Sequence, residues 1–126
     1  GADAVARAGD VLQISYVAAG NRHGVIVSLD DRGVVTLHHP SNPQGAPLLR
    51  GRGEQPLPFG YALDDAAGFE RFVFVTSGDA ALDVAAVVEA ARATARAPGA
   101  DSNPLRLPSH WHQTSVTLAK EPPPAI

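Results

Sequence analysis

The stretch Phe69-Glu-Arg-Phe-Val-Phe-Val-Thr76 is the strongest strand signal in the chain. Aromatic and β-branched residues fill most of it, and these residue types are enriched in strands. Phe72 and Phe74 would fall on one face of such a strand, and the valines that alternate with them on the other, because successive side chains point to opposite faces. Apolar residues on both faces predict a central strand that is covered from two sides.

A single helix is predicted after this strand, over residues 80–97. Apolar residues recur there at helical spacing, and charged residues lie off the stripe. Ser77 or Asp79 would cap the start of the helix, and Pro98-Gly99 would end it. We expect the helix to cover one face of the 69–76 strand. The apolar stripe consists of Val84, Val87, Val88, Ala91 and Ala95.

Three strand patterns precede the central strand. Residues 11–17 alternate between apolar and polar side chains, which is typical of a half-buried strand. Residues 25–29 and 34–39 follow, joined by a short acidic turn in which Gly33 can take a positive φ angle. We expect these three strands to form an antiparallel meander.

The second half of the chain has weaker strand signals. Residues 40–58 are rich in proline and glycine, so we predict a long loop with at most one short edge strand. Residues 61–63 are a further brief strand candidate. A last strand is expected over residues 113–118, with Val116 and Leu118 pointing inward.

Together these elements predict a mainly β fold with one helix, of the α+β class. We expect an antiparallel β-sandwich or a small barrel-like sheet with the helix packed on it, because short strands joined by Gly/Pro turns favour such folds. Residues 9–119 would form a single domain, preceded by a cloning remnant or linker at 1–8 and followed by a Pro-rich tail at 120–126. The chain has no methionine, even at position 1, which predicts a piece of a longer protein.

The composition excludes several functions. The 126 residues are 44% hydrophobic and 18% charged, which is ordinary for a folded domain. The net charge of -3 offers no basic stripe, so we expect no nucleic-acid binding. There is no cysteine, which excludes disulfides, thiolate catalysis and Cys-ligated zinc. No apolar run approaches the ~18 residues of a membrane span.

Two histidines end the third predicted strand. His38 and His39 are neighbours, so strict alternation would send their side chains to opposite faces and prevent one metal ion from binding both. His39 would share the core face with Val35 and Leu37. We therefore interpret the pair as the end of a strand that Pro40 terminates.

The segment His110-Trp-His112 is a better metal candidate. On an extended segment His110 and His112 would share a face and could meet one metal ion. A third ligand would have to come from another histidine, such as His23 or His38, or from a carboxylate. The competing interpretation is an exposed loop before the last strand, with Trp111 packed as a hydrophobic plug.

Two acidic pairs, Asp30-Asp31 and Asp64-Asp65, could support acid–base chemistry if one carboxyl were buried with a raised pKa. Both pairs lie in predicted turns, where aspartate usually accepts hydrogen bonds from local backbone N–H groups. For Glu70 and Arg71 we expect an ion pair or a hydrogen bond to a neighbouring loop. The chain lacks the Gly-x-Ser-x-Gly, phosphate-loop and His-Glu-x-x-His motifs. We therefore predict no catalytic residue and no cofactor.

Several short motifs resemble a bacterial family of uncharacterised β-rich domains. Such domains occur in C-terminal or extracytoplasmic parts of signalling proteins, including membrane-anchored anti-sigma-factor-like proteins with an N-terminal zinc-finger module, and related domains accompany caspase-like or kinase modules. The resemblance spans about residues 9–84 and implies a fold, with no catalytic residue to carry over. Its motifs are Gly9-Asp10, Gly24-Val-Ile-Val-Ser-Leu-Asp30, Gly33-Val-Val-Thr-Leu-His-His-Pro40, Leu57-Pro58, Leu63-Asp-Asp-Ala-Ala-Gly-Phe-Glu-Arg-Phe72 and Val75-Thr-Ser77.

The leading hypothesis is a non-enzymatic sensory or protein-interaction domain. The resemblance implies the periplasmic part of an envelope-signalling protein in the bacterial inner membrane. A protein or peptide partner would bind at an exposed sheet edge or at the loop 40–58. The alternatives are a metal- or small-ligand-binding module at His110 and His112, and a hydrolase that pairs Asp64 or Asp65 with a histidine.

Overall fold

The computed structural model describes residues 4–78 and 81–122. The protein is mainly β with one helix in its C-terminal half, as the sequence predicts. Its elements are β1 (Ala4–Arg7), β2 (Val11–Val17), β3 (His23–Asp30), β4 (Val35–His39), β5 (Glu54–Ala62), β6 (Gly68–Ser77), α1 (Val84–Ala95) and β7 (His112–Glu121).

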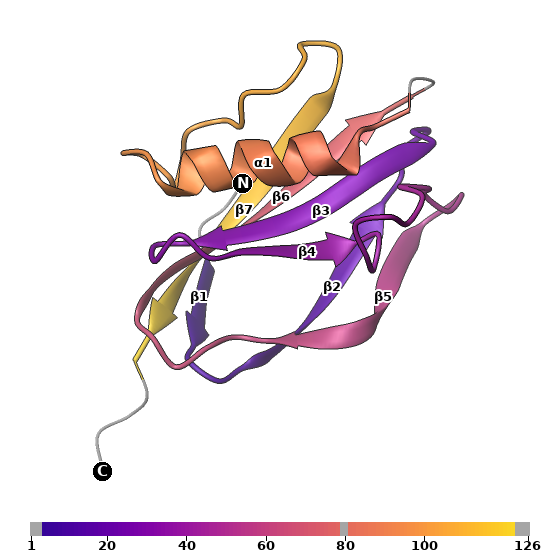
Figure 1. Ribbon diagram of the computed structural model, residues 1–126. Helices are drawn as coiled ribbons and strands as arrows, with labels where there is room; N and C mark the ends of the chain where they lie inside the picture. Colours follow the sequence, from indigo (N-terminus) through magenta and orange to yellow (C-terminus); the bar gives the residue numbers. More distant parts are fainter. Residues whose placement is uncertain (1–3, 79–80, 123–126) are drawn as a thin grey trace.

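The strands form two sheets. The larger is five-stranded with the order β1-β7-β6-β3-β4, and the smaller is a two-stranded ribbon of β2 and β5. All pairings are antiparallel except that of β1 with β7, which is parallel. Helix α1 lies on one side of the large sheet and the ribbon on the other (Figure 1). The large sheet is therefore the middle layer of the molecule.

Strand β6 lies between β3 and β7, and its two faces contribute to different cores. Val73 and Val75 are fully buried and pack with Val87 of the helix. Phe74 points the other way, toward a second cluster that includes Tyr16 of the ribbon. The prediction of a central strand with two apolar faces is therefore confirmed.

Helix α1 is shorter than predicted. It begins at Val84 because the side chain of Asp83 caps it, accepting a hydrogen bond from the backbone N–H of Ala86. Ser77 ends β6 instead of capping the helix, and Asp79 lies outside the described residues. Arg96 forms the C-cap, before the predicted Pro98-Gly99 end. No helix in the described part of the chain is long and apolar enough to cross a membrane.

The predicted meander of three strands is wrong, because β2 leaves the layer of β3 and β4. It pairs with β5, a nine-residue strand that begins inside the predicted long loop. The prolines of β5 are compatible with this pairing because a two-stranded ribbon leaves one side of each strand free. Tyr16 explains the position of β2, since its ring packs 5.8 Å from that of Phe74 on the large sheet.

Three assignments near the sheet edge also differ from expectation. Residues 4–7, assigned to a remnant or linker, form β1, and the first residues of the predicted tail continue β7 through Glu121. Val116, expected to point inward, is 46% exposed. Beyond residue 117 β7 is flanked by β1, whereas its first residues have no such neighbour.

The helix-side core should depend strongly on Val87, whose side chain is fully buried. Val87→Ala should lower the free energy of unfolding by about 2 kcal/mol, because it removes buried methyl groups and leaves a cavity. Urea unfolding measures this change. Val34→Ala is the matched control, because Val34 is 53% exposed and should change stability by less than about 0.5 kcal/mol. Equal losses in both variants would contradict the assigned packing.

Candidate functional site

A β-bulge places His38 and His39 on the same side of the large sheet. Ile26 of β3 pairs with His39 and Val27 pairs with Leu37, so His38 is the extra residue between two regular pairs. Strict alternation, which sent the two imidazoles to opposite faces, therefore fails here. Both rings lie on the ribbon side, away from the helix.

His38 is buried in a polar and aromatic pocket. Its Nε2 lies 2.7 Å from Oγ of Ser28, and its ring lies edge-on to Tyr61 with the centroids 4.5 Å apart. Only 2% of the residue is exposed. Burial lowers the pKa of His38 from 6.5 to about 4, because a charged imidazolium would lose its hydration. The ring is therefore neutral near pH 7.

His39 holds the following loop. Its Nε2 lies 2.8 Å from the carbonyl oxygen of Leu48, to which it donates a hydrogen bond. Its ring lies 5.7 Å from the ring of Tyr16 on β2. The imidazole thus joins the end of β4, the loop and the ribbon, and it fixes the wall of a cavity between them.

This cavity, here called the proline groove, has a volume of about 480 Å³. It lies between the end of β4, the loop after it and β5. Proline, aromatic and histidine side chains form most of its walls. The lining residues are Tyr16, His38, His39, Pro40, Ser41, Gly45, Ala46, Arg50, Gln55, Pro56, Leu57, Pro58 and Phe59.

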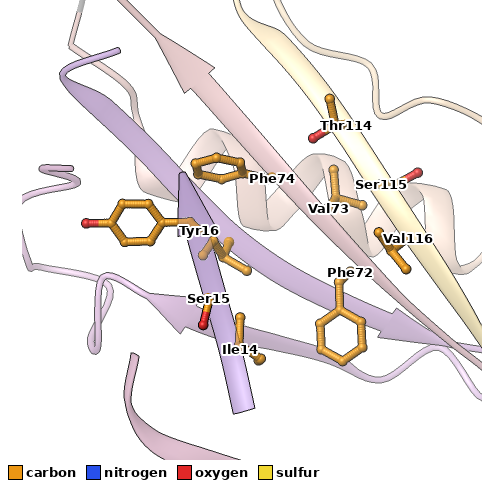
Figure 2. A pocket seen from close by; sticks show the side chains of 10 residues that line it. Ile14, Ser15, Tyr16, Phe72, Val73, Phe74, Thr114, Ser115 and Val116 are labelled. Carbon is orange, nitrogen blue, oxygen red and sulfur yellow. The ribbon is translucent and has the colours of Figure 1, made fainter. Parts of the chain in front are cut away.

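A second cavity, here called the edge groove, opens between β2 and the pair β6–β7 and has a volume of about 520 Å³. Figure 2 shows Phe72 and Phe74 on β6, Val116 on β7, and Ile14 on β2 around it. Its lining is uncharged and mostly apolar. The lining residues are Ile14, Ser15, Tyr16, Ile26, Phe72, Val73, Phe74, Thr114, Ser115 and Val116.

The outer edge of β7 borders this groove with unpaired peptide groups. The carbonyl of Glu121 faces the β1 side, because it accepts the N–H of Ala8 at 2.9 Å. Alternate residues of a strand in an antiparallel pair face the same way, so Gln113, Ser115 and Thr117 also present their N–H and C=O groups outward. Within the described residues β1 reaches as far as Leu118, beside Thr117, and no backbone group pairs with Gln113 or Ser115.

Buried charges on the ribbon side have structural partners. Tyr61 donates a hydrogen bond to Glu70 at 3.1 Å, and Lys120 Nζ lies 2.8 Å from Asp64. Burial raises the pKa of Glu70, so its carboxyl group holds a proton more readily than an ordinary glutamate does. Burial alone would lower the pKa of Lys120, but the carboxylates of Asp64, Glu70 and Asp30 raise it above its usual value. None of these four groups lines either groove.

One member of each acidic pair, Asp30 and Asp64, serves a turn, as the turn interpretation predicted. Asp30 accepts the N–H groups of Arg32 and Val34, and Asp64 accepts that of Ala66. The hydrogen bond from Lys120 lowers the pKa of Asp64, which is opposite to what a general acid needs. These contacts give the hydrolase hypothesis no support.

Arg71 also behaves as expected, because it donates hydrogen bonds to a neighbouring loop. Its guanidinium group reaches the carbonyl oxygens of Ala100 and Asn103. Arg71 is 3% exposed, so this buried cation holds the segment that follows the helix against the sheet.

The predicted metal pair is exposed. His110 lies in a turn, and His112 is the first residue of β7. Trp111 packs against the helix-side core, as the plug interpretation expected. Over residues 4–78 and 81–122, no group of three or more His, Cys, Asp or Glu side chains could hold a metal ion. A metal site at His110 and His112 stays a prediction without a third ligand.

Sequence reasoning missed both grooves. The bulge at His38 leaves no mark in the local pattern, because residues 34–39 alternate as in a regular strand. The alternation predicted for residues 11–17 is present and Tyr16 is buried, but the pattern does not show that Tyr16 lines both grooves. The proline density of residues 40–58 was the one available signal, and it was interpreted as a loop.

The buried His38 should make stability depend on pH. The pKa of His38 is about 4 in the folded state, and its usual value, which applies to the unfolded state, is 6.5. Between pH 4 and pH 6.5 the unfolded state therefore binds more protons than the folded state. The free energy of unfolding should therefore fall as pH falls from 6.5 to 4, by about 3 kcal/mol from this group. Urea unfolding of wild type and His38→Gln across this range measures the difference.

His110→Gln is the control, because His110 is exposed and should leave the pH dependence unchanged. Glu70 has a raised pKa, so it contributes to the pH dependence of the free energy of unfolding with the opposite sign and favours the folded state at low pH. This contribution is the same in wild type and in both variants, so it cancels when their curves are compared. Parallel pH curves for wild type and His38→Gln would show that His38 is not the responsible group.

Comparison of the chain with protein-family models, with curated protein sequences and with solved structures finds no match. The resemblance of its motifs to bacterial signalling domains is therefore an expectation from short stretches alone. What the protein does has to be argued from the edge of β7 and the two grooves.

Proposed function

We propose that this chain is a protein-interaction domain, and not an enzyme, which binds an extended peptide segment of a partner by strand addition to β7. The observation that supports this is the unpaired, uncharged edge of β7 at Gln113 and Ser115, beside the apolar edge groove. Strand addition uses main-chain hydrogen bonds for affinity and pockets for alternate side chains for specificity.

The other edges of the two sheets are protected. Natural sheets blunt their edges with proline, lysine, bulges or short strands. Strand β4 has the bulge at His38 and ends before Pro40, and β1 has four residues. In the ribbon, the pairing of β2 has a register shift between Gln13 and Ser15, and β5 contains two prolines. The segment 112–117 has no lysine, proline or register shift. An additional strand could therefore pair with this segment without meeting a proline, a lysine or a bulge.

The edge groove would receive the side chains of the added strand. Val116 is on the ribbon side of β7, and its exposed surface faces the groove together with Phe72. Alternate side chains of a peptide paired with β7 would lie beside Val116 on this side. The side chains between them would lie toward the helix side, next to Ser115 and Thr117. The expected ligand therefore has apolar residues at every second position.

The wider setting is also part of the proposal. The resemblance of the motifs supports a place in the periplasm, as part of an inner-membrane, anti-sigma-factor-like protein of a bacterium. The structural roles of Glu70, Lys120 and Asp64 support a binding role over catalysis, because each is engaged in holding the fold.

Selection from a phage-displayed library of random peptides tests strand addition. Wild type should enrich sequences with alternating apolar residues. Ser115→Pro should abolish their binding, because it removes an outward N–H without removing a bond to β6. Val116→Lys should weaken binding at least tenfold, because a charge at an edge disfavours pairing.

Val34→Lys is the matched control, because Val34 is an equally exposed valine far from β7 in sequence, in the β3–β4 turn. Thermal unfolding of every variant confirms that each is folded. The proposal is wrong if enriched peptides bind Ser115→Pro and Val116→Lys as tightly as wild type, or if no peptide is enriched over the Val116→Lys background.

A further inference from the structure

We propose that the proline groove binds a small organic carboxylate with a compact apolar or aromatic body. This site does not rest on strand addition at β7: it lies on the side of the ribbon that faces the end of β4, and the two grooves have only Tyr16 in common. The chemistry of its lining, the free donors in it and its size each support this ligand class.

The charge of the lining favours an anion. Arg50 lines the groove, and no aspartate or glutamate does. In the described part of the chain the guanidinium group of Arg50 has neither an ion pair nor a side-chain hydrogen bond. A carboxylate is the natural partner, because arginine binds it through two parallel hydrogen bonds.

Tyr16 supplies a second donor beside Arg50. Its hydroxyl oxygen accepts the backbone N–H of Arg50 at 2.8 Å, which fixes the start of the arginine side chain next to the phenol. Tyr16 is only 7% exposed, and among the described residues its own hydroxyl proton has no acceptor. Figure 2 shows the hydroxyl pointing away from β7 and the edge groove. The hydroxyl proton is therefore free to donate a hydrogen bond to a ligand oxygen in the groove.

The histidines shape the groove without binding the ligand through Nε2. Nε2 of His39 is occupied by the carbonyl of Leu48, and Nε2 of His38 by Ser28. Much of the remaining wall is rigid, because Pro40, Pro56 and Pro58 contribute to it, and Ser41 and Gln55 are its polar members. Rigid walls reduce the ordering cost of binding. The volume of about 480 Å³ is within the range of small-molecule sites.

Paired probes that share a ring but differ in charge test the proposal. Benzoate is compared with benzyl alcohol, and cyclohexanecarboxylate with cyclohexanemethanol, by amide chemical-shift titration at pH 7. The two carboxylates should give saturable shifts at Arg50 and at residues of the proline groove, and the alcohols should bind more weakly. Arg50→Gln should weaken carboxylate binding about tenfold or more, the usual effect of losing a charged hydrogen bond.

Arg52→Gln is the matched control, because Arg52 belongs to the same loop but does not line the groove. Its affinity for the carboxylates should equal that of wild type. Tyr16→Phe should also weaken binding, with folding checked by the dispersion of the amide signals. The proposal is overturned if neither carboxylate gives saturable shifts, if each alcohol binds as tightly as its carboxylate, or if Arg50→Gln and Arg52→Gln behave alike.

Discussion

The burial of β6 on both of its faces is the constraint on which the rest of the molecule depends. Val73 and Val75 require a cover on one face, which α1 supplies, and the phenylalanines require a cover on the other, which the ribbon supplies. The large sheet is therefore covered by α1 on one side and by the ribbon on the other, because burying apolar surface from both faces of a strand stabilises the fold. The edge groove is the region where the ribbon covers the phenylalanine face incompletely, next to β7.

A single extra residue in β4 decides the second groove. The bulge at His38 turns two neighbouring imidazoles to one side, where one is buried against Ser28 and Tyr61 and the other anchors the loop at Leu48. The loop is thereby held over the ribbon, and Arg50 is held at Tyr16. The two proposed sites thus share Tyr16 as a common wall, with the edge groove beside β7 on one side and the proline groove on the other.

Local patterns predicted much of the fold and little of the candidate sites. The alternation of residues 11–17 and the turn at Asp30 were interpreted correctly, because both depend on neighbours in sequence. The capping residue was missed, since Asp83 is three residues beyond the expected start of the helix. Val116 was placed inward from its apolar character, although the tertiary structure leaves it beside an open groove.

The sequence by itself determined the secondary structure class, the central strand, the single helix and the structural role of the acidic turns. These follow from periodicity and from hydrogen bonds between residues close in the chain. Only the tertiary structure decided that β2 pairs with β5, that His38 is a bulge residue and that β7 keeps an open edge. Each of these depends on the register between segments distant in sequence, and a shift of one residue reverses the face of every side chain that follows.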